Sequence, residues 1–168
     1  MKIGVLSDSH DNMAMILAAL ELFEAERVEA AIHAGDIVAP FAAKLLKRFA
    51  GPLHVVYGNN DGEREGLAGV LPQISPGPLR VDLAGRRIIV HHWIEQVPPE
   101  ATAGADVIIT GHTHVIVNDR VEGRHPTLIL NPGECCGVLT GRSTAAILDT
   151  DSLSARIVTL GEGEAWKV

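Results

Sequence analysis

The amino-acid sequence predicts an α/β fold formed by a single domain. Strand-like and helical patterns alternate along the N-terminal third of the chain, and short strand-like runs separated by turn residues fill most of the remainder. With 168 residues the chain has the size of one domain, and folding would bury roughly 70% of the surface of the unfolded chain. No long linker or internal repeat divides the sequence, so we expect one domain over residues 1–168.

The N-terminal part predicts a βαβαβ unit with a parallel sheet. Three apolar runs are expected to be strands, and they cover residues 3–6, 30–34 and 53–57. Apolar side chains recur at helical spacing from Met13 to Phe23, and a second helix is expected over residues 41–49 because Pro40 favours the first position of a helix. Strands that alternate with helices in this way form parallel sheets.

The C-terminal part predicts a mixed or antiparallel sheet that packs on the first sheet. After a stretch rich in proline and glycine, seven strand-like runs cover residues 79–83, 87–90, 107–110, 115–121, 127–130, 144–148 and 155–160. Residues 84–86 and 122–124 have the composition of hairpin connections. Only a short helix is expected between Gln96 and Ala105, because Pro98 and Pro99 lie there. Residues 63–74 are expected to form a loop.

The charge and the cysteine content exclude several classes of protein. A net charge of −7 and a pI near 5.5 argue against broad electrostatic binding to nucleic acid or to anionic membranes. The N-terminal residues lack the pattern of a signal peptide, and no apolar run reaches the ~18 residues of a transmembrane helix. Cys135 and Cys136 are adjacent and cannot join distant segments. We therefore expect a cytoplasmic protein without a disulfide framework.

Seven side chains with metal-binding atoms follow the predicted strands. They are Asp8, His10, Asp36, Asn59, His91, His112 and His114. Seven ligands are more than one four-coordinate ion with an open position uses, but they suit two adjacent ions that share a carboxylate and leave room for water. The sequence therefore predicts a binuclear metallohydrolase.

Two pairs of these residues have spacing that suits a shared ion. Asp8 and His10 are two residues apart, so both side chains project to the same side of an extended segment. His112 and His114 have the same spacing after an apolar strand and form the most specific of the motifs. His33 differs, because it lies within a predicted strand and is expected to be a hydrogen-bonded core histidine.

For other polar residues the sequence leaves a structural alternative open. Asp36 has two oxygens that allow it to bridge two ions, although a Gly-Asp pair is also common in ordinary turns. Asn59 offers an amide oxygen as a neutral ligand, but its neighbours also suit a plain turn. Asp61 either orients the Asn59 loop or closes a turn. Thiol chemistry at the two cysteines is a minor alternative, since nothing near them in the sequence lowers their pKa.

The order of these motifs resembles that of a known family. The motifs that carry the resemblance are Asp8-x-His10, Gly35-Asp36, Gly58-Asn59-x-Asp61, His91 and Gly111-His112-Thr113-His114. They resemble the signature of the calcineurin-like metallophosphoesterases. The short chain and its segment 131–137 are similar to the small bacterial and archaeal branch often called YfcE-like. The resemblance implies a four-layer α/β/β/α sandwich of two mixed β-sheets flanked by helices, with metals above the strand ends.

The resemblance also implies a role for each motif. One ion would lie among Asp8, His10, Asp36 and His114. The second ion would lie among Asp36, Asn59, His91 and His112. Asp36 would then bridge the two ions. The residues expected to take part in catalysis are Asp36, Asn59, Asn60 and His91.

The activity that the resemblance implies is that of a metal-dependent phosphodiesterase. A metal-bridging hydroxide would attack a small phosphoester substrate. Mn²⁺ or Ni²⁺ is expected, while Fe or Zn also suits the site, because imidazole, amide and carboxylate ligands together do not select among these metals. The expected partners include neither a membrane nor an extended nucleic acid, and the chain is compatible with a homo-oligomer, either a dimer or a tetramer.

The sequence departs from the family at two positions. The superfamily usually has a histidine where this chain has Asn60, and an amide is no general acid at neutral pH. Substrates with good leaving groups are therefore expected to react best. Where the family commonly has His-Gly-His, this chain has His91, His92 and Trp93. His91 then aligns as the ligand, whereas the indole of Trp93 cannot coordinate a metal.

Two alternatives to a phosphodiesterase remain. A related eukaryotic vacuolar-sorting subunit resembles this fold but uses it mainly for protein contacts, so the first alternative is a protein-binding scaffold with little or no catalysis. A scaffold would be expected to lose metal ligands, and this chain retains all seven. The second alternative is a phosphomonoesterase.

Overall fold

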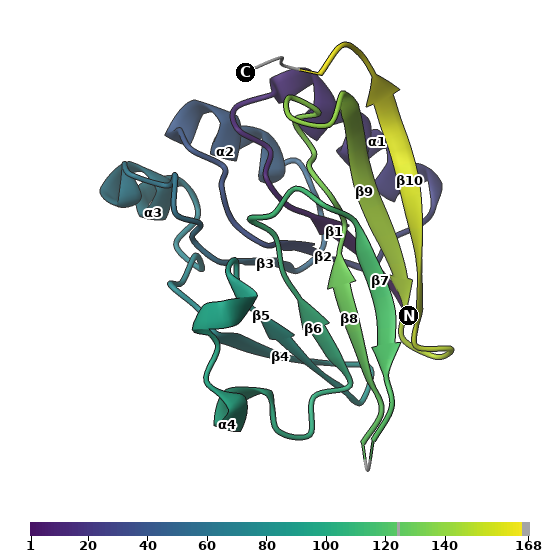
Figure 1. Ribbon diagram of the computed structural model, residues 1–168. Helices are drawn as coiled ribbons and strands as arrows, with labels where there is room; N and C mark the ends of the chain where they lie inside the picture. Colours follow the sequence, from purple (N-terminus) through teal and green to yellow (C-terminus); the bar gives the residue numbers. More distant parts are fainter. Residues whose placement is uncertain (124, 166–168) are drawn as a thin grey trace.

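The computed structural model describes residues 1–123 and 125–165 and consists of two five-stranded β-sheets that pack face to face (Figure 1). The first sheet has the strand order β10-β9-β1-β2-β3. Its strands are β1 (Lys2–Leu6), β2 (Ala30–His33), β3 (Leu53–Val55), β9 (Arg142–Asp149) and β10 (Ser154–Glu162). The second sheet has the order β4-β5-β6-β8-β7. Its strands are β4 (Leu79–Leu83), β5 (Arg86–Val90), β6 (Val107–Ile109), β7 (Val117–Val121) and β8 (Thr127–Asn131).

The predicted βαβαβ unit is confirmed. β2 pairs in parallel with both β1 and β3, and the two connections contain α1 (Met13–Ala25) and α2 (Pro40–Leu46). Asn12 caps α1, because its side chain accepts a hydrogen bond from the backbone N–H of Met15. Pro40 occupies the first helical turn of α2, where its missing N–H costs nothing.

A third helix, α3 (Arg64–Val70), replaces the loop that we predicted over residues 63–74. Gly66 and Gly69 lie within it, and glycine is a poor helix former, so the sequence carries only a weak helical signal. Leu67 is the helix residue that is buried, and it packs in the same core cluster as the other two helices. Tertiary packing therefore decides the conformation of this segment.

The second sheet is mixed, as predicted. β5, β6 and β8 are parallel to one another, while β4 and β7 are antiparallel edge strands. The predicted connection at residues 84–86 is a hairpin, with Leu83 paired to Arg86. The other predicted hairpin, at residues 122–124, includes Arg124, which lies outside the described residues.

The prediction that all C-terminal strands join the second sheet is wrong for the last two. β9 pairs antiparallel with β1, and β10 pairs with β9, so both strands extend the first sheet. Residues 143–148 are buried without alternation, as expected for a central strand covered on both faces. Such a run identifies a buried strand but does not specify its partner.

Three apolar clusters define the layers of the fold. The first lies between the first sheet and helices α1–α3, and the second lies between the two sheets. The second cluster includes Ile3 and Val5 of β1 with Ile88 and Val90 of β5, and burial of each side chain contributes about 1.5–3 kcal/mol. The third cluster lies on the outer face of the second sheet, where Ile94 of the 3-10 helix η1 (Ile94–Gln96) packs against it. The short helix α4 (Pro99–Thr102) follows η1 in the chain. The predicted α/β/β/α sandwich is confirmed, with a thin fourth layer.

The carboxyl ends of the parallel strands of both sheets meet at one edge of the sandwich. Loops after β1 and β2 contact loops after β5, β6 and β8 there. Ligand sites in open α/β sheets form outside the carboxyl ends of parallel strands. Within the described residues, no helix is long and apolar enough to cross a membrane.

Candidate metal centre

A cluster of polar side chains occupies the edge where the strand ends of the two sheets meet. The first sheet contributes Asp8 and His10 after β1, Asp36 after β2 and Asn59 after β3. The second sheet contributes His92 after β5, and His112 with His114 after β6. Six of the seven predicted ligands thus lie in the cluster, together with His92.

At several positions in the cluster the backbone has a left-handed conformation that residues other than glycine rarely adopt. Asp8, His10, Asp36, His112 and His114 all have positive φ, between 38° and 69°. Such conformations cost on the order of 1–3 kcal/mol each and concentrate at functional sites. Backbone hydrogen bonds join the loops and hold them in place, from Asp8 N to Gly35 O and from His10 N to Asp36 O, both 3.0 Å long.

Two glycines allow these loops to approach one another. A Cβ atom at Gly58 would overlap the carboxylate and backbone nitrogen of Asp36. A Cβ atom at Gly111 would overlap the hydroxyl of Ser7 and lie 2.8 Å from Asp8 Oδ2. The glycines of the Gly-Asn and Gly-His motifs are therefore required by close packing around the carboxylates.

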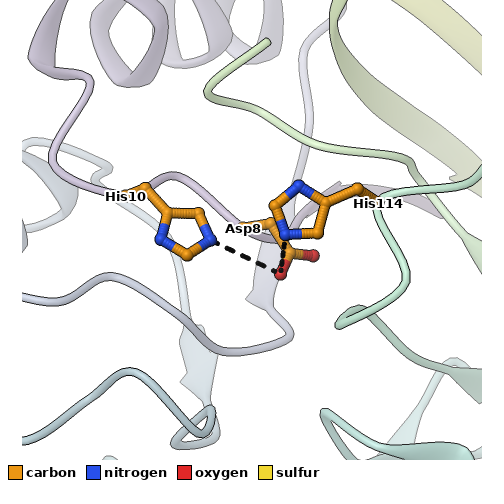
Figure 2. Close-up of side chains that lie close together, drawn as sticks. All are labelled: Asp8, His10 and His114. Atoms are coloured by element: carbon orange, nitrogen blue, oxygen red, sulfur yellow. Dashed lines mark ion pairs between the residues drawn. The ribbon is translucent and has the colours of Figure 1, made fainter. Parts of the chain in front are cut away.

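Asp8, His10 and His114 form the first group of ligand atoms (Figure 2). Asp8 Oδ1 lies 3.9 Å from His10 Nε2 and 3.4 Å from His114 Nε2, and Asp36 Oδ2 lies 3.6 Å from His10 Nε2. Ligand atoms around a tetrahedral ion with ~2.1 Å bonds are about 3.4 Å apart. His10 Nε2 is buried and has no hydrogen-bond partner among the described residues. A cation between these atoms would satisfy it.

Asp36, Asn59, His92 and His112 form the second group. Asn59 Oδ1 lies 3.0 Å from His92 Nε2 and 2.7 Å from His112 Nδ1. His92 Nε2 also lies 3.4 Å from Asp36 Oδ2. The same oxygen of Asp36 therefore borders both groups.

The carboxylates of the cluster lack a full positive counter-charge. Asp8 is 0% exposed and Asp36 is 1% exposed, and burying charge is costly unless the charge is paired. In the part of the chain that the structure describes, histidines alone form ion pairs with these two carboxylates. The donor set thus fits divalent cations, which would supply the missing charge.

The pKa values reflect this concentration of charge. Burial raises the pKa of Asp8 above its ordinary value. Burial also opposes ionisation of Asp36, but hydrogen bonds from His92 and Asn60 outweigh it and hold the pKa of Asp36 below its usual range. Burial disfavours the charged form of His92, yet the Asp36 and Asp8 carboxylates outweigh it and raise the pKa of His92.

His92 lies among the candidate ligands, whereas the family resemblance pointed to His91. In β5, Ile88 and Val90 face the first sheet, and Ile89 faces the outer cluster. Successive strand residues alternate in direction, so His92 continues on the inner side and His91 on the outer side. His91 Nδ1 accepts a hydrogen bond from Trp93 N at 3.0 Å, and no ion pair or hydrogen bond joins it to the cluster within residues 1–123 and 125–165.

Asn60 and Trp93 contact the ligand residues. Asn60 donates two hydrogen bonds of 2.7 Å to the Asp36 carboxylate, one from its backbone N–H and one from its side-chain amide. The Trp93 ring stacks on the His112 ring, with centroids 4.1 Å apart. Asn60 therefore fixes the rotamer of Asp36, and Trp93 covers one face of His112.

Asp61 connects the loops rather than closing a simple turn. Its carboxylate is 2% exposed and accepts hydrogen bonds from the backbone N–H groups of Asp36, Val38 and Gly58. His33 is a buried, hydrogen-bonded histidine, as expected. Its Nδ1 accepts from the N–H of Gly35, and burial lowers its pKa to about 4, so it supports the loops in its neutral form.

Glu134, in the loop after β8, is the site residue that the motifs did not identify. Its carboxylate lies 2.6 Å from His114 Nδ1. Burial opposes its ionisation, but hydrogen bonds from His114 and Thr140 outweigh burial and lower its pKa to about 2. The signal available in the sequence was its position in the segment 131–137 that follows a buried strand.

The two cysteines do not support thiol chemistry. Cys135 is fully buried, and burial raises its pKa above the ordinary value. Burial raises the pKa of Cys136 to about 12, and its Sγ donates to Glu134 Oε2 at 3.1 Å. Both thiols therefore stay protonated and unreactive near neutral pH.

Comparison with known proteins gives consistent matches along the chain. Residues 1–153 match the calcineurin-like phosphoesterase superfamily domain. A protein of Methanocaldococcus jannaschii that is named as a phosphodiesterase is 38% identical over 168 residues, which cover 95% of this chain and 99% of that protein.

Solved structures agree with these matches. The structure of an archaeal phosphodiesterase has 36% identity and a TM-score of 0.80, covering 95% of this chain and 99% of that chain. YfcE, a phosphoesterase from E. coli, has 22% identity and a TM-score of 0.71, covering 96% of this chain and 100% of its own. At this lower identity the similarity concerns the fold alone.

Proposed function

The chain belongs to the calcineurin-like phosphoesterase superfamily, and on this basis we propose that it hydrolyses phosphodiester bonds with two divalent metal ions held where the two sheets meet. The observation that carries the proposal is the position of Asp36 Oδ2. It lies 3.6 Å from His10 Nε2 in one ligand group and 3.4 Å from His92 Nε2 in the other. A carboxylate that borders both ligand groups could bridge two adjacent ions of a binuclear hydrolase.

The two ligand groups define which residues would hold each ion. The residues for the first ion are Asp8, His10, Asp36 and His114. The residues for the second ion are Asp36, Asn59, His92 and His112, with His92 in place of His91. When bound, the ions would supply a water molecule of lowered pKa and positive charge for the phosphate oxygens. We propose Mn²⁺ or Ni²⁺, with Fe or Zn as alternatives, because this ligand set does not select among them.

The chain's own residues prepare the centre for this chemistry. Both ring nitrogens of His92 face oxygen atoms, with Ala34 O 2.8 Å from Nδ1 and Asn59 Oδ1 3.0 Å from Nε2. The bond to Ala34 fixes the ring, so that Nε2 points into the centre. Asn59 would contribute a neutral amide oxygen, which leaves an ion more electrophilic than a third carboxylate would.

Asn60 sets the substrate preference that we propose. Its amide holds Asp36 by a 2.7 Å hydrogen bond and cannot protonate a leaving group at neutral pH. Departure of the alcohol then depends on the acidity of the leaving group itself. A small diester with an acidic leaving group is therefore the substrate class that suits the centre best.

Removal and restoration of metal tests the proposal. The protein is stripped with a chelator, checked by metal analysis and titrated with Mn²⁺ while turnover of bis(4-nitrophenyl) phosphate is followed. We expect no turnover without metal and saturation at two ions per chain. His125→Ala serves as a control, because this histidine lies half-exposed beside Asp106, away from the ligand groups.

Three outcomes would contradict the proposal. Full turnover of verified metal-free protein would show that the ions are not needed. Saturation at one ion per chain would contradict the shared Asp36. Absence of turnover on monoesters, cyclic nucleotides and activated diesters with both ions bound would favour the protein-binding scaffold.

A further inference from the structure

Glu134 is a buried carboxylate directly behind the candidate ligand His114. It is 1% exposed, and its Oε2 lies 2.6 Å from His114 Nδ1. The opposite ring nitrogen, His114 Nε2, lies 3.4 Å from Asp8 Oδ1 in the first ligand group. The imidazole thus connects Glu134 with the centre.

Every hydrogen-bond partner of Glu134 is able to donate. Oε1 accepts from the N–H and the hydroxyl of Thr140, at 2.5 Å and 2.7 Å. Oε2 accepts from the N–H of Leu139 and from Cys136 Sγ, both at 3.1 Å, in addition to His114. A carboxylate that accepts hydrogen bonds from five donors is favoured in its ionised form, which acts only as an acceptor.

This arrangement determines the tautomer of His114. Since an ionised carboxylate only accepts hydrogen bonds, Nδ1 of His114 must carry a proton. A neutral imidazole protonated at Nδ1 has its lone pair on Nε2, the atom that faces Asp8. We propose that Glu134 is a positioning residue that fixes both the ring orientation and the tautomer of His114 for binding of the first ion. The role rests on the proposed metal binding at this centre.

A separate metal site at Glu134, His114 and Cys136 suits these contacts less well, because Leu139 and Thr140 already donate hydrogen bonds to the two oxygens of Glu134. The separations of 2.6 Å and 3.1 Å between Glu134 Oε2 and its two neighbours are those of hydrogen bonds. The Cys136 thiol is also protonated near neutral pH, because burial raises its pKa to about 12.

Glu134→Gln is the informative substitution, because glutamine has similar size but one donor group. If its amide nitrogen faces His114, it donates to Nδ1, and the ring proton moves to Nε2, which can then no longer bind an ion. If the amide nitrogen faces Thr140, two donors face each other, because the backbone N–H of Thr140 also needs an acceptor. Either orientation disturbs the arrangement. Thr140→Val is the matched control, since it removes one hydrogen bond to Glu134 and leaves His114 untouched.

The experiment has two readouts on metal-free and metal-titrated protein. The tautomer of His114 is measured by ¹⁵N NMR without metal, and the affinity for each Mn²⁺ ion is measured by calorimetry. In the parental chain and in Thr140→Val we expect the Nδ1–H tautomer. In Glu134→Gln we expect a shift toward Nε2–H and about 10–100-fold weaker binding of one ion, as for other partners of metal-bound histidines. The second ion should bind as in the parent.

The outcomes separate this role from the proposed hydrolysis. An Nε2–H tautomer in the parental metal-free protein would overturn the role of Glu134, whatever the activity. Parental affinity for both ions in a folded Glu134→Gln variant would also overturn it. If Glu134→Gln does not fold, the tautomer of His114 in the parent and the Mn²⁺ affinities of Thr140→Val test the role of Glu134 instead. A parent that binds both ions but lacks turnover would contradict the proposed function and leave the positioning role supported.

Discussion

Substitution of the adjacent residues His91 and His92 tests directly which histidine is a ligand of the second proposed ion. We predict that His92→Ala removes one ligand of that ion, whereas His91→Ala leaves the ion in place. The two substitutions are matched in chemistry and lie at neighbouring positions. The difference in metal affinity between the two variants therefore shows which of the two rings faces the candidate metal centre.

The contacts of the two rings set the expected magnitudes. His92 is 3% exposed and lies 3.0 Å from Asn59 Oδ1 and 3.4 Å from Asp36 Oδ2. Outer partners of metal ligands are worth about 10–100-fold in affinity, so we expect loss of a direct ligand to weaken one ion about 100-fold, or about 2.7 kcal/mol. His91 is partly exposed and makes one hydrogen bond to Trp93, so His91→Ala should change affinity only about twofold.

The assay is a calorimetric titration of each metal-free variant with Mn²⁺, followed by turnover of an activated diester. His92→Ala also leaves Ala34 O without its 2.8 Å partner, so thermal unfolding of the metal-free proteins is measured in parallel to separate folding from metal binding. Loss of an ion in His91→Ala, with both ions retained in His92→Ala, would refute the alternation argument.

Three further predictions concern the shared carboxylate, the leaving group and the close-packed loop. Asp36→Ala should abolish binding of both ions, and metal analysis that still finds two ions per chain would exclude a bridging role. Asn60→His should flatten the dependence of rate on leaving-group pKa, with a gain of about tenfold for poor leaving groups; equal slopes in parent and variant, with metals bound equally, would contradict this. Gly111→Ala should destabilise the protein by more than about 1 kcal/mol, because its Cβ overlaps the Ser7 hydroxyl, and an unchanged denaturation midpoint would count against this packing.

The sequence was sufficient to predict most of the side chains that gather at the candidate metal centre. Ligands placed just after apolar runs become neighbours because the carboxyl ends of parallel strands meet at one edge. This reasoning holds for Asp8, Asp36 and His114, each of which follows a parallel strand. It needs no knowledge of how far apart these residues are in the chain.

To choose between His91 and His92, one must know which face of β5 points toward the first sheet. Ile88, Ile89 and Val90 are all buried, so hydrophobicity alone does not show which face of β5 points inward. The outer cluster of Ile89, Ala105 and Ile108 shows which face of β5 points outward, and this cluster joins residues that are distant in the sequence. The resemblance alone therefore did not show that His92, rather than His91, lies beside Asn59 and Asp36.

The roles of Glu134 and of the last two strands depend on long-range pairing. Glu134 reaches His114 because the loop after β8 packs beside β1, with hydrogen bonds from Cys135 N to Ser7 O and from Cys136 N to Asp8 O. β9 joins the first sheet by pairing with β1, although more than a hundred residues separate them. Local composition predicts such strands and loops but does not select their partners.

The most direct test of the binuclear centre is a crystal structure of the Mn²⁺-loaded protein with anomalous diffraction from the metal. We predict two anomalous peaks about 3.5–4 Å apart, both bonded to the carboxylate of Asp36. His92 should bind the second ion, and His114 should bind the first through Nε2. A single peak, or a second peak without contact to Asp36, would contradict the shared carboxylate on which the proposed function depends.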